Sequence, residues 1–241
     1  MGVLKTTVTV TLALAVLLWS GATHAQQRPK EQAVVFFGYD TTGDDHYGYA
    51  GASIAPFGSI HEQGWRIRVF GFGAGFEYAG PGGRTTNATG GGGSASIGYD
   101  WRFDGLRITT YVGGAARHFD TSPENPSSSL EDENVGLPVQ VESNYRLSQQ
   151  LGINVIGLYT FFYDTYWTRV RPTIWLAWRD LRAGPEFTFL GGDEWDRQRY
   201  GAFVSGFQVG RLNIGLKGGV EYDSREHETG GYGGIEMSFT F

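Results

Sequence analysis

The sequence contains no cysteine, has few charged residues, and has no long hydrophobic run beyond its first segment. Because none of the 241 residues is a cysteine, disulfides and thiolate chemistry are excluded. Charged residues make up only 18% of the chain, and 25 acidic residues outnumber 19 basic ones. Nucleic-acid binding needs a basic footprint, so we expect no nucleic-acid partner. After the N-terminal segment there is no run of about eighteen apolar residues, which excludes a transmembrane helix there.

The N-terminal segment Met1–Ala25 has the features of a secretory signal peptide. Lys5 lies near the start, the apolar stretch Val8–Trp19 follows, and small residues precede Gln26. Cleavage after Ala25 fits this pattern, as does cleavage after Ala22. We therefore expect residues 1–25 to be a cleaved signal peptide, residues 26–33 to be a short periplasmic segment, and residues 34–241 to form one domain.

Glycine and aromatic residues are abundant, and they lie within segments of alternating polarity. The chain has 38 glycines, and aromatic residues make up 15% of it. In Leu212–Asp223, the clearest example, Leu212, Ile214, Leu216 and Val220 fall on one face, and Lys217, Glu221 and Asp223 fall on the other. A strand with an apolar and a charged face is typical of a transmembrane barrel, which has lipid outside and a polar lumen inside.

This two-residue period predicts an all-β protein, an antiparallel transmembrane β-barrel of the outer membrane with about twelve strands. Ten strands is the alternative count. One strand contains Pro172, which cannot donate to a ladder, so we expect a bulge or a missing bond there. The predicted strands are Val34–Asp40, His46–Ala55, Gly64–Tyr78, Gly92–Phe103, Leu106–Phe119, Val135–Leu147, Gln150–Tyr163, Tyr166–Trp178, Arg182–Leu190, Arg197–Gly210, Leu212–Asp223 and Tyr232–Phe241.

Tight and longer connections alternate along these strands, as periplasmic turns and external loops do. The longest predicted loops are Ala79–Gly91 and Thr121–Asn134, whereas Pro56–Gln63 is long for a periplasmic turn. The last strand ends in Phe239 and Phe241, which are typical of the C-terminal barrel-insertion signal of outer-membrane proteins.

More than half of the acids gather in or beside the predicted external loops. Such an anionic rim is either simply hydrated or shares divalent cations with lipopolysaccharide phosphates, and we expect outer-membrane lipid and lipopolysaccharide as partners. No loop has the ligand spacing of a specific metal site, so we predict no metal and no cofactor. The acids are Asp40, Asp44, Asp45, Asp120, Glu124, Glu131, Asp132, Glu133, Asp193, Glu194, Asp196, Asp223, Glu226 and Glu228.

Charged residues within the strands are predicted to face the lumen, because an arginine facing lipid at the midplane costs about 2–4 kcal/mol. Inside the barrel they either pair into a plug-like network or line a wet pore, and the sequence leaves both arrangements open. The set comprises Arg66, Arg68, Arg107, Arg117, Arg169, Arg171, Glu142, Glu186, Glu221 and Glu236.

Aromatic residues near the predicted strand ends are typical of an interfacial girdle. These are Trp101, Tyr145, Tyr163, Tyr166, Trp178 and Tyr222. Aromatic faces also stack against sugar rings. Trp195, in an acidic loop, and Trp167 and Trp175, on a predicted inward face, are the candidates for glycan contact.

A catalytic arrangement is not evident. His118 lies near Ser122, and His227 lies near Ser224, as in barrel hydrolases that use a Ser–His pair. The chain has no Gly-x-Ser-x-Gly motif and no evident group to orient either histidine, so we predict no catalytic residues.

Several segments together resemble the cellulose biosynthesis protein BcsS family. They are Gly38-Tyr39-Asp40, Tyr47–Ala52, Gly64–Arg68, Asp164–Arg169, and Gly184–Phe187 running into Gly191–Gly210. The resemblance spans nearly all of the expected mature chain, with the segments in the expected order. It implies a membrane-associated accessory protein of bacterial cellulose production and secretion, and it carries over no catalytic residues.

The functional hypothesis is therefore a non-enzymatic outer-membrane barrel that assists cellulose biosynthesis or secretion. It either contacts the β-glucan or acts as a scaffold for the export complex, with cellulose and cellulose-synthase subunits as expected partners. The alternatives are a barrel enzyme acting on outer-membrane lipid, or a surface barrel or adhesin with no link to glucan.

Overall fold

The computed structural model describes residues 30–43, 45–79, 85–123, 134–162, 164–176, 181–192, 195–224 and 227–241. The predicted signal peptide, residues 1–25, and the segment 26–29 lie outside these residues. Within the described residues, no helix is long and apolar enough to cross a membrane.

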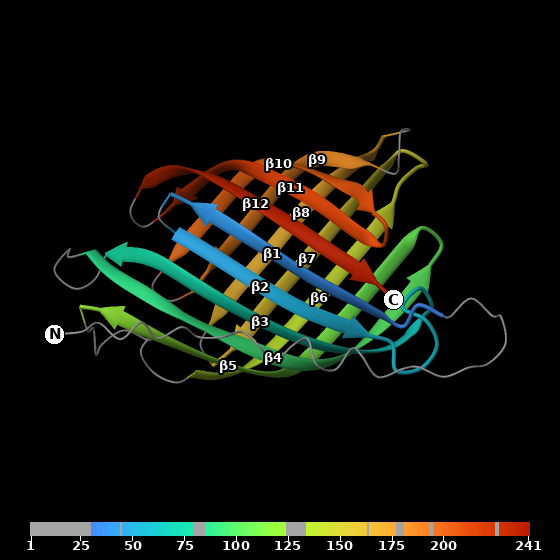
Figure 1. The fold of residues 1–241 in the computed structure, drawn as a ribbon, viewed down its shortest axis with the longest axis horizontal. Coiled ribbons are helices and arrows are strands. Elements are labelled where there is room, and N and C mark those ends of the chain that lie inside the picture. Colours follow the sequence, from blue (N-terminus) through green and yellow to red (C-terminus); the bar gives the residue numbers. More distant parts are fainter. Residues whose placement is uncertain are drawn as a thin grey trace.

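Twelve antiparallel strands close into one barrel, in which each strand pairs with its sequence neighbours and β1 pairs with β12 (Figure 1). This confirms the predicted all-β barrel and its strand number, and rules out ten strands. The strands are β1 (Ala33–Thr42), β2 (Asp45–Ile54), β3 (Gly64–Ala79), β4 (Thr85–Phe103), β5 (Leu106–Ser122), β6 (Asn134–Arg146), β7 (Leu151–Phe161), β8 (Thr165–Trp175), β9 (Arg182–Gly191), β10 (Asp196–Val209), β11 (Leu212–Asp223) and β12 (Glu228–Thr240).

The first and last strands meet at one rim of the barrel, which we call the periplasmic end. There the Phe241 carbonyl accepts backbone N–H bonds from Gln32 and Ala33, both 2.9 Å long, and the Phe241 N–H donates to the Ala33 carbonyl at 3.0 Å. The link between β2 and β3 lies at the same end, since Ala55 donates to the Gln32 carbonyl at 2.7 Å. The hairpin between β1 and β2 lies at the opposite, external end (Figure 1).

Strand β4 is longer than the sequence predicts. We expected a loop over Ala79–Gly91, but its second half, Thr85–Gly91, continues β4 and pairs residue by residue with β3. The prediction was wrong because this stretch of threonine, glycine and other small residues does not alternate between large apolar and charged side chains. A search for a two-residue period therefore cannot detect it.

Pro172 leaves a gap in the ladder between β8 and β9, as predicted. Pairing passes from Val170 with Phe187 to Ile174 with Ala183, and the register is the same on both sides of the gap. On its other side Pro172 stays opposite Ile153 of β7. The proline thus removes local pairing without creating a bulge.

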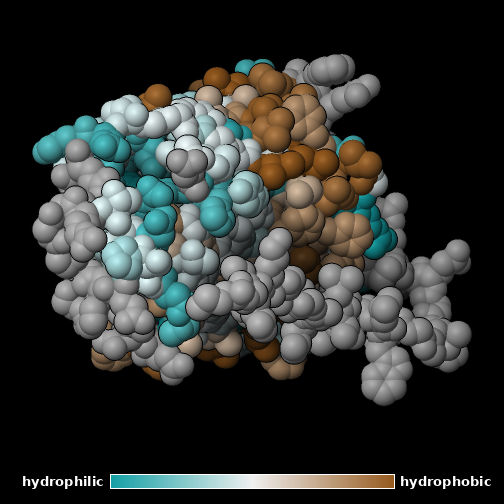
Figure 2. All heavy atoms as spheres, turned by 60° about the vertical axis from the view of Figure 1, so that its left-hand side comes forward, coloured by the Kyte–Doolittle hydropathy of each residue, from teal (hydrophilic) through white to brown (hydrophobic). Residues whose placement is uncertain are grey.

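The outer surface of the barrel is rich in large apolar side chains. Hydrophobic residues cover much of the barrel wall, and hydrophilic residues gather at the external end (Figure 2). Because closure leaves no unpaired edge, such strands can cross the hydrocarbon layer with nearly all of their backbone groups paired. Exposed members include Ile67, Val69, Ile97, Val112, Val141, Ile174, Leu216 and Val220.

Aromatic residues mark the periplasmic side of this apolar surface. Trp65, Tyr99 and Trp101 form a cluster, with ring centroids 5.4 Å apart for Trp65–Tyr99 and 5.0 Å apart for Tyr99–Trp101. Tyr145 is also exposed near this end. Of the predicted girdle residues, Tyr163 and Trp178 lie outside the described residues.

Candidate functional site

The lumen contains a cavity of about 760 Å³, which is the hollow of the barrel itself. All twelve strands contribute to its lining, and two residues of the β2–β3 link, Ile60 and His61, reach it from the periplasmic end. Any molecule inside the barrel would therefore meet side chains from the whole circumference. The two sides of this hollow differ sharply in chemistry.

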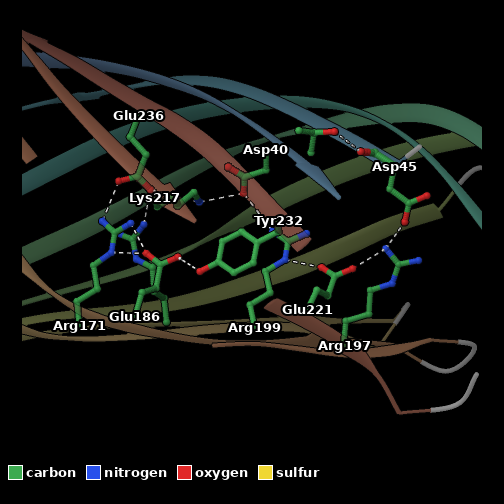
Figure 3. Close-up of polar contacts among 12 residues, drawn as sticks. Asp40, Asp45, Arg171, Glu186, Arg197, Arg199, Lys217, Glu221, Tyr232 and Glu236 are labelled. Carbon is green, nitrogen blue, oxygen red and sulfur yellow. Dashed lines mark hydrogen bonds and ion pairs between the residues drawn. The ribbon is translucent and has the colours of Figure 1, made fainter. Parts of the chain in front are cut away.

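One side is built around Glu236 of β12, which pairs with three cations; Figure 3 shows two of them, Arg171 and Lys217. Its carboxylate accepts from Arg169 Nη1 at 2.6 Å and from Arg171 Nη1 at 2.8 Å, and it lies 3.5 Å from Lys217 Nζ. Arg171 also pairs with Glu186. Because β8, β9, β11 and β12 each place these residues on their inward face, strands that are not neighbours become linked across the lumen.

The ion pairs continue from Lys217 toward the external end (Figure 3). Asp40 of β1 accepts from Lys217 Nζ at 2.9 Å and from Arg199 Nη1 at 3.1 Å. Arg199 in turn donates to Glu221, and Arg197 pairs with Glu221 and Asp45.

We call this connected set the charge ladder. No side chain in it is more than 19% exposed, and its five cations face six carboxylates, so its charge is nearly balanced. Its members are Asp40, Asp45, Arg169, Arg171, Glu186, Arg197, Arg199, Lys217, Glu221, Asp223 and Glu236.

The other side of the lumen carries a continuous row of aromatic rings from β1, β2, β3 and β5. Along the row, centroid distances are 6.5 Å for Phe36–Phe70, 6.3 Å for Phe70–Phe72, 6.3 Å for Phe72–Phe119 and 5.7 Å for Phe76–Phe119. Two tyrosines of β2 widen it, with centroid distances of 6.1 Å for Tyr49–Phe70 and 5.7 Å for Tyr47–Phe72. We call this set the aromatic strip: Phe36, Tyr47, Tyr49, Phe70, Phe72, Phe76 and Phe119, all of which line the cavity.

Glycines on the inward face make room for the strip. A Cβ atom at Gly38 would lie 2.5 Å from the Tyr49 ring, and one at Gly51 would lie 2.5 Å from the Phe36 ring. The rings thus lie against bare backbone of the neighbouring strand. This close approach leaves space inside the barrel that ordinary side chains at these glycines would fill.

The sequence-based expectation of a polar lumen was therefore wrong on this side. In β3, Phe70 and Phe72 face inward while Ile67 and Val69 face outward, so both faces are apolar. A two-residue period cannot decide which of two apolar faces meets lipid. The signal available in the sequence was the inward glycines on the neighbouring strands.

The three tryptophans proposed for glycan contact are separated. Trp167 and Trp195 line the cavity, and the Arg169 guanidinium lies 5.4 Å from the Trp167 ring centroid. Trp175 lies at the periplasmic end of β8, 4.9 Å beneath the guanidinium of Arg146.

The predicted lumen charges take three positions. Arg68, Arg107, Arg169, Arg171 and Glu236 line the cavity. Glu186 and Glu221 are buried members of the charge ladder that do not line the cavity, and Arg66 is fully buried at the periplasmic end. Arg68 pairs with Glu142 of β6, which is a second link across the lumen.

Several acids assigned to external loops lie inside the barrel instead. Asp40 is buried in β1 because that strand runs to Thr42, beyond its predicted end. Asp45 and Asp223, at strand ends, pair with Arg197. The ladder residues Arg197 and Arg199 were not among the predicted lumen charges, although their inward phase within an alternating strand could have indicated them. Lys217 was placed on the charged face of Leu212–Asp223, and it lines the cavity.

The two histidines that lie near serines in the sequence contact other groups in the structure. His118 lies 3.4 Å from Asp120, and His227 Nδ1 lies 2.9 Å from the Tyr222 hydroxyl. Ser224 donates to the Asp196 carbonyl. Among the described residues, no three histidines or carboxylates are grouped so as to hold a metal ion.

A closed antiparallel barrel with an apolar exterior and an ion-paired lumen defines the chain as a β-barrel protein of the bacterial outer membrane. The family model for the cellulose biosynthesis protein BcsS matches residues 34–241, so the chain belongs to that family. It is therefore an accessory outer-membrane barrel of cellulose biosynthesis. No curated protein matches the sequence.

Solved structures with the same fold have little sequence identity to the chain. The KdgM porin in complex with disordered oligogalacturonate is 11% identical, with a TM-score of 0.52 over 86% of this chain and 99% of that chain. The transport unit of the autotransporter AIDA-I from Escherichia coli is 8% identical, with a TM-score of 0.52 over 91% and 93% of the two chains. At this identity the likeness concerns the fold alone.

Proposed function

We propose that the barrel is a non-enzymatic accessory protein that contacts a β-glucan chain within its lumen. The observation that carries the proposal is the aromatic strip, which lines the cavity beside the charge ladder: Tyr47 pairs across the strands with Asp40, and the Arg197 guanidinium lies 6.0 Å from the Phe76 ring centroid. A β-glucan presents apolar ring faces and a periphery of hydroxyl groups. Such a chain needs both a stacking surface and polar partners, and the two sides of the lumen supply one each.

The strip suits a polymer better than a compact ligand. Its rings follow one another from Phe36 through Phe70 and Phe72 to Phe76, along the strands rather than around one point. Stacking contributes on the order of 1 kcal/mol per ring and tolerates sliding, because each sugar unit presents a similar face. A chain could thus be held and still move.

The charge ladder offers hydroxyl groups a preorganised polar surface. Its carboxylates and guanidiniums are already paired, so a neutral sugar can exchange hydrogen bonds with them without leaving a bare charge. The volume of about 760 Å³ also lies in the usual range for ligand cavities, about 300–1,000 Å³. The KdgM porin, which has the same fold, binds an oligosaccharide, as its structure with oligogalacturonate records.

Binding of fluorescently labelled cellohexaose to the purified barrel in detergent tests the proposal. The double variant Phe70→Ala/Phe72→Ala should weaken binding about tenfold or more, because two stacking rings are lost. Fluorescence anisotropy gives the dissociation constant, and the gel mobility of unheated samples reports that the barrel is folded.

Phe187→Ala is the matched control, because it makes the same change on a ring that packs against Tyr200 on the wall, 6.2 Å between centroids, and does not line the cavity. It should leave binding unchanged. Equal affinity of the strip variant and the wild type would contradict the proposal.

A gene deletion separates glucan contact from the scaffold alternative. Deletion should change the amount of cellulose, or its division between cell surface and medium, and the wild-type gene should restore it. If the barrel contacts glucan, Phe70→Ala/Phe72→Ala should not restore cellulose although it reaches the outer membrane. If the barrel is instead a scaffold that works only through its periplasmic turns, the same variant should restore cellulose fully.

The lipid composition of the outer membrane tests whether the barrel is non-enzymatic. His118→Ala and His227→Ala should leave the lipid A and phospholipid profiles of the outer membrane as in the wild type. This follows because these histidines contact Asp120 and Tyr222 rather than the nearby serines. A changed profile in mass spectrometry of extracted lipids would favour a lipid enzyme.

A further inference from the structure

An unusual group of arginines lies at the periplasmic mouth of the barrel. Arg102 of β4 and Arg107 of β5 are directly opposite each other in the pairing of these two strands. Like charges in this position destabilise a strand pair. Asp100 lies between them and accepts from Arg102 at 3.3 Å and from Arg107 Nε at 2.8 Å.

One carboxylate cannot neutralise this group. Asp100 also accepts from Arg66 at 3.0 Å, and both of these side chains are completely buried, so a single carboxylate is shared by three guanidiniums. Among the described residues, no other carboxylate forms an ion pair with Arg102 or Arg107. Two positive charges thus exceed the negative charge, whereas the charge ladder is nearly balanced.

A third cation extends the group along the rim. Arg146 of β6 donates its backbone N–H to Gly105, in the turn between Arg102 and Arg107, at 2.7 Å. Its guanidinium stacks on Trp175 at 4.9 Å, and no acid of the described residues pairs with it. Three neighbouring strands therefore present arginines at the same end of the barrel.

These guanidiniums remain open to a ligand. The side chains of Arg102 and Arg107 are 32% and 36% exposed, and Arg107 lines the lumen cavity. A guanidinium has five N–H donors, more than the contacts to Asp100 and to the Ile60 carbonyl use. The planar fork of an arginine matches the two oxygens of a carboxylate or a phosphate.

We propose that the periplasmic mouth is a binding site for the anionic substituents, carboxylate or phosphate, of a glycan. A glycan is the occupant because Arg107 lines the same cavity as the aromatic strip, so a chain on the strip brings its substituents to the mouth. In this respect the inference rests on the proposed function. It adds that the lumen prefers a glycan bearing negative charge to an uncharged one.

Binding of labelled trigalacturonate and labelled cellotriose to the purified full-length barrel tests the inference. At low salt, trigalacturonate should bind more tightly than cellotriose, and its advantage should shrink as salt screens the charges. Arg107→Gln should weaken trigalacturonate binding about tenfold and affect cellotriose binding much less, so that the preference for trigalacturonate is lost. Arg107→Lys should retain part of the preference because it keeps the charge but loses the fork.

Arg211→Gln is the matched control, since it removes an exposed arginine from another turn, between β10 and β11. It should not alter either affinity. Equal binding of the two trisaccharides to the wild type, or a preference that survives Arg107→Gln, would overturn the inference.

A glutamate-rich peptide that binds this site more tightly than trigalacturonate would make a protein segment the ligand and would also overturn the inference. The result is independent of the cellohexaose experiment. The anion preference can fail while the aromatic strip still binds neutral glucan, and the reverse can also occur.

Discussion

Glu236→Gln should lower the free energy of unfolding by about 3–5 kcal/mol, because removing one partner of a buried ion pair leaves uncompensated charge. Glu236 is the shared acceptor of Arg169, Arg171 and Lys217. Glutamine has nearly the same shape, so the loss comes from charge rather than from packing. Urea unfolding of the barrel in detergent, followed by tryptophan fluorescence, measures the change.

Glu228→Gln provides the comparison for this experiment. It makes the same chemical change in the same strand, but at an exposed position at the external end. Its unfolding midpoint should match that of the wild type, because exposed charges contribute little. Equal midpoints for both variants would mean that the charge ladder does not stabilise the barrel.

Deletion of Phe241 should remove most of the folded barrel from the outer membrane. The residue provides three backbone hydrogen bonds that join the end of β12 to Gln32 and Ala33. Each contributes about 0.5–1.5 kcal/mol in water, and an unpaired group costs more beside lipid. The fraction of barrel that migrates as the compact form in unheated gels of the membrane fraction measures assembly.

Phe241→Ala distinguishes the two roles of this residue. It keeps the backbone bonds but loses the ring, which lies 5.5 Å from that of Phe239. If assembly depends on closing the seam, the alanine variant should assemble far better than the deletion. If it fails equally, the terminal ring is recognised as an insertion signal, and a normal yield after deletion would contradict both roles.

The strand order and number could be predicted because the constraint behind them is local. Every second residue of a transmembrane strand meets lipid, so apolar and polar residues alternate along such a strand. Leu212–Asp223 and similar segments can therefore be recognised from the sequence. The same reasoning predicted the local gap at Pro172, since a missing N–H is a property of one residue.

The interior could not be predicted to the same extent, because it depends on strands that are far apart in the sequence. The pairing of Asp40 with Arg199 needs β1 and β10 on one side of a closed ring, and no local pattern shows this. The aromatic strip could not be predicted for another reason: Phe70 and Phe72 alternate as lipid-facing residues would. Only their position opposite inward glycines such as Gly51 and Gly92 distinguishes them.

The ion pairs across the lumen also bear on how long the barrel lasts once it has formed. Arg169 and Arg171 of β8 reach Glu236 of β12, and Arg197 of β10 reaches Asp45 of β2, so none of these pairs joins adjacent strands. They can form only after the sheet has curled and closed, which puts them late in folding. Interactions absent from the transition state slow unfolding without speeding folding. The charge ladder should therefore mainly slow unfolding, which gives the assembled barrel a long lifetime.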